Sequence, residues 1–413
     1  MASHARGGRS NRVITVEEAR ERLMASRPVP RTENVSLTDG VGRVIAEPSV
    51  VAPIDVPPFA NSAMDGFAVR AADLPGRLRI TGEVAAGAGQ LPTVEVGTAV
   101  RISTGAPMPP GADAVVPIEQ ATDAGAEVEV PLPVPSGDHV REAGHDTRIG
   151  DEIDLPSPLT PAAIGVLASL GMAEVTVQAR PRVAILSSGE ELTAPGTPLA
   201  EGHIYDANMP ALVAAVTEMG GEPVPLPRVS DDPAAVEAAL RDAAEAGDLV
   251  LTSGGVSVGA HDHVRDAIKR LGELDFWRIA MQPGKPLAVG RIGETAVIGL
   301  PGNPVSALVV AELLVRPLIR AVLGLSGDGR RHVRATLDDE LRKDPERAAY
   351  LRVVLRQTDA GWVASPAGGQ LSSQLRALAA ATGLLVVPIG EPAGRAGHSY
   401  DTILLSDPDP VAG

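Results

Sequence analysis

Acidic side chains that could bind a cation follow the apolar runs in the middle of the chain. Six carboxylates lie at or just beyond the ends of strands that we expect between residues 182 and 325: Glu190, Glu191, Asp206, Asp231, Asp232 and Asp262. Carboxylate oxygens beside a phosphate are the ligands that Mg²⁺ prefers. Each residue could instead cap a helix or lie in a solvated turn, and Asp262, an expected N-cap, could do both. The pattern therefore indicates a Mg²⁺ site, with helix capping as the open alternative.

Three loops at expected strand ends could hold the phosphate itself. They are Ser187-Ser188-Gly189-Glu190-Glu191, Ser253-Gly254-Gly255-Val256-Ser257-Val258-Gly259 and Pro301-Gly302-Asn303-Pro304-Val305-Ser306. The glycines of the second loop allow successive backbone N–H groups to approach an anion. In the third, Asn303 and Pro304 are typical of a helix start, whose positive dipole end attracts anions. Any one loop could be an ordinary strand–helix turn, but three within one segment favour a phosphate-bearing ligand.

Other motifs that could indicate a binding or catalytic site are less specific. The loop at 253–259 is not followed by Lys-Ser/Thr, and no G-x-G-x-x-G opens a helix, so neither standard nucleotide motif is present. Lys285, one of only three lysines, could supply a compact positive charge or be an ordinary surface lysine. His261 and His263 are two residues apart and would not share a helix face, which argues against zinc. Ser188 lacks the G-x-S-x-G surroundings of a nucleophilic serine.

The elements that must position these loops alternate between strand and helix. Apolar runs predict strands at Val183–Leu186, Leu249–Leu251 and Val297–Leu300, and helical spacing predicts helices at Met209–Met219, Pro233–Ala246, Asp262–Leu271 and Pro304–Leu323. This alternation is typical of a parallel, doubly wound α/β sheet. Ligands of such sheets bind beyond the carboxyl ends of the strands, where the three loops would meet.

The segments on either side show a different pattern of apolar, proline and glycine residues. A capping box formed by Thr15 and Glu18 predicts a helix over 15–25, and a second helix is expected over 159–170. Between them, residues 50–140 show short apolar runs separated by proline and glycine turns, which indicates a β-rich module. After Gly329 the same pattern returns, with strands expected at Val333–Leu337, Tyr350–Leu355 and Leu384–Pro388.

Composition excludes several classes of protein. The 413 residues include 36 Lys+Arg and 52 Asp+Glu, which gives a net charge of −16, and they include no cysteine. Without cysteine there is no disulfide, thiol nucleophile, iron–sulfur cluster or cysteine zinc site. The acidity and the scarcity of aromatic residues argue against nucleic acid as a partner. With no long apolar run and no signal-peptide core, we expect no membrane partner and a cytoplasmic location.

Several segments together resemble the molybdopterin molybdenumtransferases, the MoeA family, which is related to the gephyrin E domain. The resemblance is carried by Gly42-Arg43-Val44-Ile45-Ala46-Glu47, Asn61-Ser62-Ala63-Met64-Asp65-Gly66, Gly82-Glu83-Val84-Ala85-Ala86-Gly87, Thr104-Gly105-Ala106-Pro107, Ser188-Gly189-Glu190-Glu191-Leu192, Ile204-Tyr205-Asp206-Ala207-Asn208, the loop at 253–259, Pro283-Gly284-Lys285-Pro286 and Leu300-Pro301-Gly302-Asn303-Pro304. It implies that adenylylated molybdopterin and molybdate are the substrates, and that AMP leaves in the presence of Mg²⁺ while molybdenum stays on the dithiolene.

The resemblance also implies an architecture of four parts in a homodimer with a shared active site. After a tail at 1–12 that we expect to be disordered, the four parts are a linker and dimerisation domain from 13–50 and 141–180, an inserted β-rich domain at 51–140, a three-layer doubly wound α/β molybdopterin-binding domain at 181–328, and a β-rich, barrel-like C-terminal domain at 329–413. A molybdopterin adenylyltransferase is implied as the upstream partner.

Site residues follow from the same resemblance. The implied catalytic residues are Asp65, Glu191, Asp262 and Lys285, and the implied metal ligands are Glu191, Asp231 and Asp262. The implied substrate-binding residues are Thr104, Ser188, Gly189, Asp206, Asn208, Ser253, Gly254, Gly255, Ser257, Pro283, Gly284, Pro301, Gly302, Asn303, Pro304, Arg352 and Ser372. Asp65 and Thr104 are implied to serve the site of the partner subunit.

The chain departs from the family pattern at Ala60 and Phe67, where many members have Asp and Tyr, and at Gln282, where some have Lys. Near the C-terminus, Gly369-Gln370-Leu371-Ser372 matches the usual Gln-Gly-Ser only loosely. Two other functions remain open. An adenylyltransferase would share the α/β domain, although it would not need the β-rich module or the C-terminal domain. A non-enzymatic scaffold would need a partner-binding groove.

Overall fold

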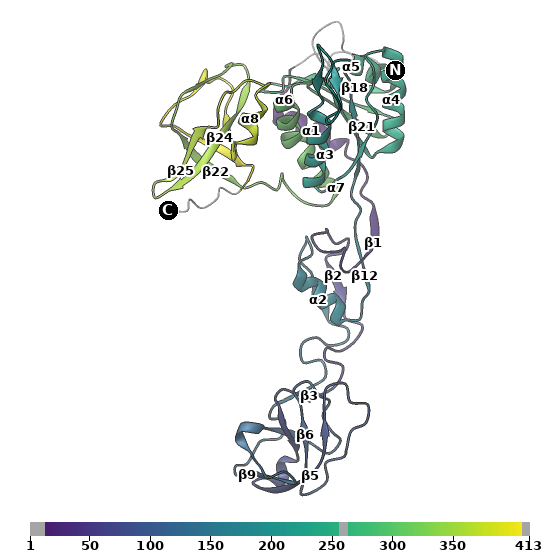
Figure 1. The fold of residues 1–413 in the computed structure, drawn as a ribbon, viewed down its shortest axis with the longest axis vertical. Coiled ribbons are helices and arrows are strands. Elements are labelled where there is room, and N and C mark those ends of the chain that lie inside the picture. The colour runs from purple at the N-terminus through teal and green to yellow at the C-terminus, as the bar shows by residue number, and fades with distance from the viewer. Residues whose placement is uncertain (1–12, 256–262, 407–413) are drawn as a thin grey trace, which may run out of the picture. The chain divides into compact units, whose positions relative to one another are not determined.

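The computed structural model describes residues 13–255 and 263–406. Contacts within the chain divide it into two compact units (Figure 1). The smaller unit is Thr32–Val177, and the larger unit joins the described residues of Met1–Arg31 to those of Gln178–Gly413. In the described ranges no helix is both long and apolar enough to cross a membrane.

The larger unit is built on a six-stranded sheet. Its strands, in spatial order, are β16 (Glu222–Pro225), β13 (Arg182–Ser187), β17 (Leu249–Ser253), β21 (Thr295–Leu300), β20 (Pro286–Ile292) and β18 (Glu273–Arg278). The first four are mutually parallel, so their carboxyl ends lie at the same edge. The apolar runs that predicted β13, β17 and β21 are fully buried, as expected for a sheet covered on both faces.

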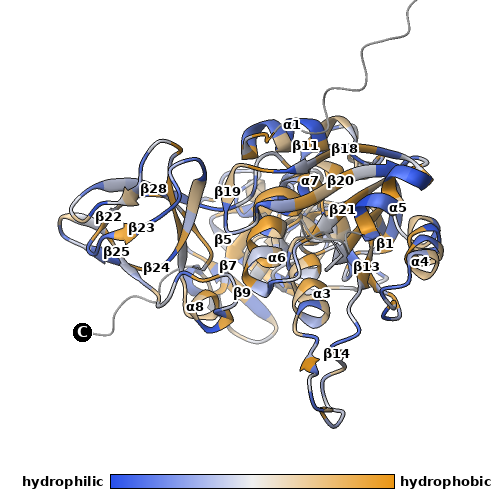
Figure 2. Cartoon of the chain, turned by 90° about the horizontal axis from the view of Figure 1, so that it is seen from above, coloured by the Kyte–Doolittle hydropathy of each residue, from blue (hydrophilic) through white to orange (hydrophobic). Residues whose placement is uncertain are grey.

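Helices cover both faces of this sheet. They are α3 (Asn208–Glu218), α4 (Pro233–Ala246), α5 (His263–Leu271), α6 (Pro304–Val310) and α7 (Arg316–Val322), and α1 (Val16–Ala25) packs on α7. Helices α4 and α5 share one hydrophobic core with alternate residues of β13, β17, β20 and β21. Figure 2 shows β20 and β21 as hydrophobic strands within this domain. The expected three-layer α/β architecture is confirmed.

Two features of the α/β domain differ from the sequence expectation. Strands β20 and β18 are antiparallel to their neighbours, because β20 and β21 are joined by a tight turn in which Gly293 adopts φ +60°. The expected helix over 304–323 is divided into α6, a π-helical turn at Ala311–Val315, and α7. Pro317, near the start of α7, cannot donate a backbone hydrogen bond, which favours such an interruption.

The C-terminal part of the larger unit is a closed β-barrel. Its strands are β22 (His332–Leu337), β24 (Ala348–Thr358), β25 (Gly361–Pro366), β26 (Gly383–Val387) and β28 (Ser399–Leu404), with α8 (Leu375–Ala379) and the pair β23 (Leu341–Arg342) and β27 (Ala393–Gly394) beside them. The ring closes because β26 pairs with both β28 and β24. Strand β19 (Met281–Gln282) leaves the α/β domain and pairs with β24, so the loop after β19 lies against the barrel.

The smaller unit is β-rich, as its proline and glycine turns predicted. Its main sheet runs β7 (Ala114–Pro117), β4 (Gly66–Val69), β6 (Thr98–Ile102), β5 (Gly76–Val84), β9 (Glu127–Val130) and β8 (Thr122–Asp123). Short pairs join β1 (Thr32–Ser36) to β12 (Glu174–Gln178), β2 (Ser49–Val51) to β11 (Glu152–Asp154), and β3 (Asn61–Ser62) to β10 (Val140–Arg141). Helix α2 (Pro161–Ser169) packs on Ile45, Val175 and Val177.

Candidate functional site

A cavity of about 670 Å³ opens at the carboxyl ends of β13, β17 and β21, where the sequence predicted a ligand. We call it the first cavity. The predicted residues that line it are Ser188, Gly189, Glu191, Asp206, Asn208, Asp231, Ser253, Gly254, Gly255, Pro301, Gly302, Asn303 and Pro304. Three loops that lie far apart in the sequence therefore form one wall. Asp262 and Ser257 were also predicted here, but they lie outside the described residues.

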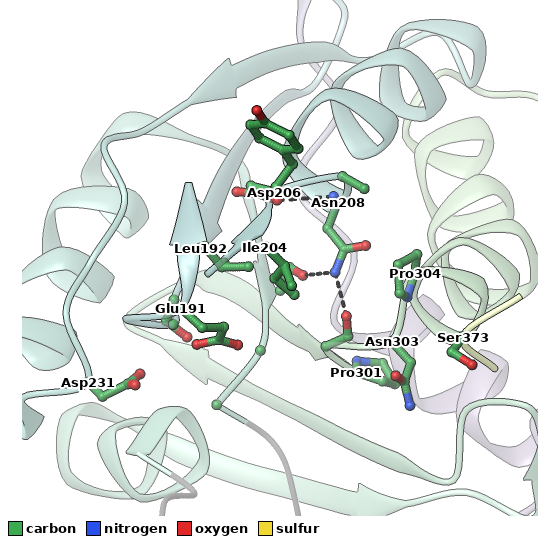
Figure 3. Close-up of a pocket in the computed structure, with 18 of the residues that line it drawn as sticks. Glu191, Leu192, Ile204, Asp206, Asn208, Asp231, Pro301, Asn303, Pro304 and Ser373 are labelled. Carbon is green, nitrogen blue, oxygen red and sulfur yellow. Dashed lines mark hydrogen bonds between the residues drawn. The ribbon is translucent and has the colours of Figure 1, made fainter. Parts of the chain in front are cut away.

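Asn208 joins two of the three loops, and a backbone hydrogen bond joins the third. Its side-chain amide donates hydrogen bonds to Ser253 Oγ at 2.6 Å and to the Gly302 carbonyl at 2.7 Å (Figure 3). The Ser188 backbone N–H donates to the Ser253 carbonyl at 3.1 Å. Gly254 adopts φ +92°, and a Cβ there would stand 2.7 Å from the Ser188 carbonyl oxygen, so only glycine fits. The cavity wall is thus a connected hydrogen-bonded frame.

The carboxylates of this segment divide into caps and cavity residues. Asp206 accepts hydrogen bonds from the backbone N–H groups of Asn208 and Met209, both at 3.0 Å, at the start of α3. Asp232 is the N-cap of α4. Glu191 and Asp231 make no such cap, and Figure 3 shows them on one side of the cavity, opposite Asn303. Capping, the alternative left open by the sequence, therefore applies to Asp206 and Asp232, whereas Glu191 and Asp231 remain candidate cation ligands.

Two polar atoms of this wall have no hydrogen-bond partner among the described residues. They are Ser188 Oγ and Asn208 Oδ1, and both are buried. A buried polar atom without a partner is costly, and native structures usually supply one. These atoms can therefore bond a ligand in the first cavity. Asn303 adds a further acceptor, because it occupies the N-cap position of α6 and its side-chain oxygen makes no capping hydrogen bond.

A second cavity, of about 570 Å³, adjoins the first and shares Pro286, Pro301 and Asn303 with it. The predicted residues Pro283, Gly284, Lys285 and Ser372 line this second cavity. Sequence reasoning missed its other polar residues, Arg342, Lys343, Asp344, Arg347 and Gln370. The available signal was the pair Arg342-Lys343 with Arg347 close behind it, although Asp344 and Glu346 lie between them.

The second cavity is positively charged. Lys343 donates to the backbone carbonyls of Asp344 and Arg347 at 3.0 and 2.6 Å, and burial lowers the pKa of its ammonium group. Hydrogen bonds from the Glu346 N–H and from Arg347 lower the pKa of Asp344, which therefore stays ionised beside Arg347. Within the described ranges, the Lys285 ammonium has no ion-pair partner. Lys285 and Arg342 both lie exposed on the cavity wall.

Arg352 lines neither cavity but lies behind the loop that borders the second. It is 1% exposed, and its guanidinium donates to the carbonyls of Gly369 and Leu371 at 3.0 and 3.3 Å. Burial lowers its pKa to about 10. Ser372, in the same loop, makes a 3.0 Å hydrogen bond with Asn303 Nδ2. Arg352 therefore supports the second cavity indirectly, by bonding the backbone of the loop that carries Ser372.

Asp65 and Thr104 lie together in the smaller unit. Asp65 Oδ1 accepts a 2.8 Å hydrogen bond from the Thr104 backbone N–H, and both residues are exposed. Of the departures from the family pattern, Phe67 is buried beneath Arg101, whose guanidinium carbon lies 5.3 Å from the ring centre. Gln282 accepts a hydrogen bond from the Asp344 N–H at 3.2 Å, so it orders the second cavity.

Mg²⁺ is compatible with the carboxylates of the first cavity. In the part of the chain that the structure describes, no group of three acidic or histidine side chains could enclose a metal ion. Mg²⁺, however, is commonly held by one or two carboxylates together with substrate phosphates. Glu191 and Asp231 provide such a pair beside the polar loops. The donor set thus fits a cation that arrives with a phosphate-bearing substrate.

Family models match three stretches of the chain. The MoeA N-terminal region (domain I and II) matches residues 14–171, a probable molybdopterin binding domain matches 184–321, and the MoeA C-terminal region (domain IV) matches 334–405. Molybdopterin molybdenumtransferase 2 of Mycobacterium tuberculosis is 42% identical over 89% of this chain and 93% of its own length. Molybdopterin molybdenumtransferase of Haemophilus influenzae is 40% identical over 76% of this chain and 78% of its own length.

Solved structures agree with these relatives. A molybdopterin biosynthesis MoeA protein of Pyrococcus horikoshii superposes with a TM-score of 0.82 at 33% identity, covering 95% of this chain and 99% of that one. A second structure from this organism gives a TM-score of 0.73 at 27% identity, covering 95% of this chain and 100% of that one. All three parts of the chain, including the closed barrel, are matched in order. The chain belongs to the MoeA family of molybdopterin molybdenumtransferases.

Proposed function

We propose that this chain inserts molybdenum from molybdate into adenylylated molybdopterin, with Mg²⁺-dependent release of AMP, in molybdenum cofactor biosynthesis. The observation that carries the proposal is the pair of adjoining cavities with different chemistry. The first offers carboxylates, an amide and loop N–H groups, and the second offers lysine and arginine. A reaction that joins a phosphate-bearing ligand to a separate oxyanion needs two such sites in contact.

The first cavity suits the adenylylated substrate. Ser188, Asn208 and the glycine loop can bond its phosphates and pterin ring without a basic surface, which an acidic protein lacks. Glu191 and Asp231, with Asp262, would hold Mg²⁺ together with the phosphates. When bound, Mg²⁺ would neutralise the charge that develops on the oxygens of the cleaved phosphoanhydride.

The second cavity suits molybdate. Lys285 presents an ammonium group without an ion-pair partner among the described residues, and Arg342 adds a second positive charge. Hydrogen bonds from such cations to an oxyanion are charge-assisted and therefore strong. Ser372 and Asn303 would supply neutral hydrogen-bonding groups at the border with the first cavity.

We propose that a molybdate oxygen attacks the phosphorus of the adenylyl group. A new O–P bond forms, and the bond from this phosphorus to the bridging oxygen breaks, leaving the phosphate on molybdopterin. The dithiolene sulfurs then displace oxygen from molybdenum, and the transferred oxygen departs on AMP. Molybdate labelled with ¹⁸O should therefore deliver label to AMP, whereas unlabelled AMP would contradict this step.

One assay tests the whole proposal. The purified protein is supplied with adenylylated molybdopterin, Mg²⁺ and molybdate, and both AMP release and active cofactor are followed. We expect AMP release that depends on molybdate. An adenylyltransferase would instead form the adenylylated substrate from ATP and molybdopterin, and a scaffold would catalyse neither reaction.

A further inference from the structure

The loop at 368–374 joins β25 to α8 and borders the second cavity through Gln370, Leu371 and Ser372. Ser372 Oγ lies 3.0 Å from Asn303 Nδ2, and Asn303 lines both cavities. The conformation of this loop therefore determines whether Ser372 can bond Asn303, which belongs to the wall that both cavities share.

Gln370 and Arg352 hold the loop by a reciprocal set of hydrogen bonds, which we call the Gln370 clasp. The Gln370 carboxamide oxygen accepts from the Arg352 backbone N–H at 3.0 Å. Its NH₂ group donates to the carbonyls of Arg352 at 3.0 Å and Gly368 at 3.1 Å. The Arg352 guanidinium donates back to the carbonyls of Gly369 and Leu371. Gln370 thus bonds the backbone of Arg352, and Arg352 bonds the backbone on both sides of Gln370.

The buried charge of Arg352 would be unfavourable if the Gln370 clasp served only to stabilise the fold. Arg352 is almost fully buried, and none of its hydrogen bonds in the described chain goes to a carboxylate. Its Nε atom has no partner there, and burial lowers its pKa. A well-packed apolar residue is often at least as stabilising as a buried charge. A buried cation that bonds only loop carbonyls is better explained by a requirement for one loop geometry.

We propose that Gln370 is a positioning residue for the transferase reaction, because the clasp presents Ser372 to Asn303 and to the oxyanion in the second cavity. This inference rests on the proposed function. Gln370 itself need not touch the substrate: it acts on Arg352, which acts on the loop that carries Ser372.

Two substitutions of Gln370 separate positioning from folding. Gln370→Glu keeps the size of the side chain, but at neutral pH it turns a carboxylate oxygen toward the Arg352 and Gly368 carbonyls. We expect the KM for molybdate to rise about tenfold, as for the loss of one hydrogen bond to a charged group, with little change in the KM for adenylylated molybdopterin. Acidification should restore part of the activity relative to wild type, because a protonated carboxyl group both accepts and donates. Gln370→Leu should show the same loss without this recovery.

A double-mutant cycle tests whether the effect passes through Ser372. If it does, Gln370→Leu combined with Ser372→Ala should be no worse than Ser372→Ala alone. Calorimetric Kd values for molybdate should follow the same order, and thermal unfolding should show that each variant is folded. Multiplicative losses, an inert Ser372→Ala, or a Gln370→Glu variant equal to wild type would overturn the inference. Failure of the wild-type protein to release AMP would instead overturn the proposed function.

Discussion

Among the described residues, the Asn208 side chain bonds two of the loops that form the first cavity, and it lies at the start of α3. Replacing it with alanine removes the bonds to Ser253 and Gly302 and leaves a buried hydroxyl without its donor. We expect Asn208→Ala to lower the free energy of unfolding by about 2–3 kcal/mol, measured by urea unfolding. Asn303→Ala, which removes a single exposed bond to Ser372, is the control and should cost well under half as much. Equal losses would show that Asn208 does not join the loops.

Substitution of Lys285 tests whether the positive charge of the second cavity binds the oxyanion. Its ammonium group is exposed, and no ion-pair partner for it is described. Lys285→Met keeps an unbranched side chain that is one atom shorter, and it removes the charge. We expect the KM for molybdate to rise by about 10- to 100-fold, since a charge-assisted hydrogen bond is lost, while thermal stability is unchanged. Lys285→Arg should retain much of the affinity. A Lys285→Met variant with unchanged kinetics would place the oxyanion elsewhere.

At the residue scale, the sequence predicted most of the first cavity but could not sort its carboxylates. Asp206 and Asp231 both follow strands and line the cavity, yet Asp206 also caps α3 whereas Asp231 caps no helix. What separates them is the local backbone: Asp206 stands two residues before Asn208, where its oxygen meets the free N–H groups of the first turn. Composition and spacing do not carry that information.

At the element scale, the apolar runs predicted the parallel strands, because buried strands must be apolar on both faces. The sequence predicted Lys285 but not the other basic residues of the second cavity. Its basic residues at 342–347 meet the loop after β19 only because Met281 and Gln282 pair with Ala348 and Ala349 of β24. A two-residue strand has no hydrophobic period to detect. The closure of the barrel by β26 and β24 is likewise a long-range pairing.

The segment between α7 and β22 contains Asp328, whose ionisation should make the stability of the protein depend on pH. Burial opposes ionisation of Asp328, but the hydrogen bonds from the Arg330 N–H and the His332 ring outweigh it, so its pKa lies below the ordinary value of 3.8. A carboxyl group with a lowered folded-state pKa stabilises the protein above its unfolded pKa, and this contribution is lost as the pH falls through the folded value.

Asp328→Asn should therefore lower the free energy of unfolding at pH 6 by about 1 kcal/mol or less, since the His332 side chain is half exposed. At a second, acidic pH below 3.8, the ordinary pKa of this carboxyl group, the difference between the variant and the wild type should be smaller. Urea unfolding at both pH values measures the difference. A difference that stays constant with pH would show that the carboxylate charge plays no part and that only the shape of the turn matters.

At the scale of the whole molecule, we propose that the chain forms a homodimer in which each active site takes residues from both subunits. Asp65 and Thr104 are bonded to each other in the smaller unit, whereas Glu191 and Lys285 line the cavities of the larger unit. Asp65→Asn keeps an oxygen that can accept the Thr104 N–H, so it should fold, and Glu191→Gln removes only an exposed charge. Each variant alone should be inactive.

If the smaller unit of one subunit completes the site of the other, mixed dimers of these two variants contain one intact site. Random reassembly in equal amounts should then restore about a quarter of wild-type activity, because half of the dimers are mixed and each has one working site of two. The matched control mixes wild type with the double variant Asp65→Asn, Glu191→Gln. A shared site makes every mixed dimer of that control inactive, whereas a site within one chain leaves its wild-type subunit active. No recovery in the first mixture, together with a working mixed dimer in the second, would place Asp65 in the site of its own subunit.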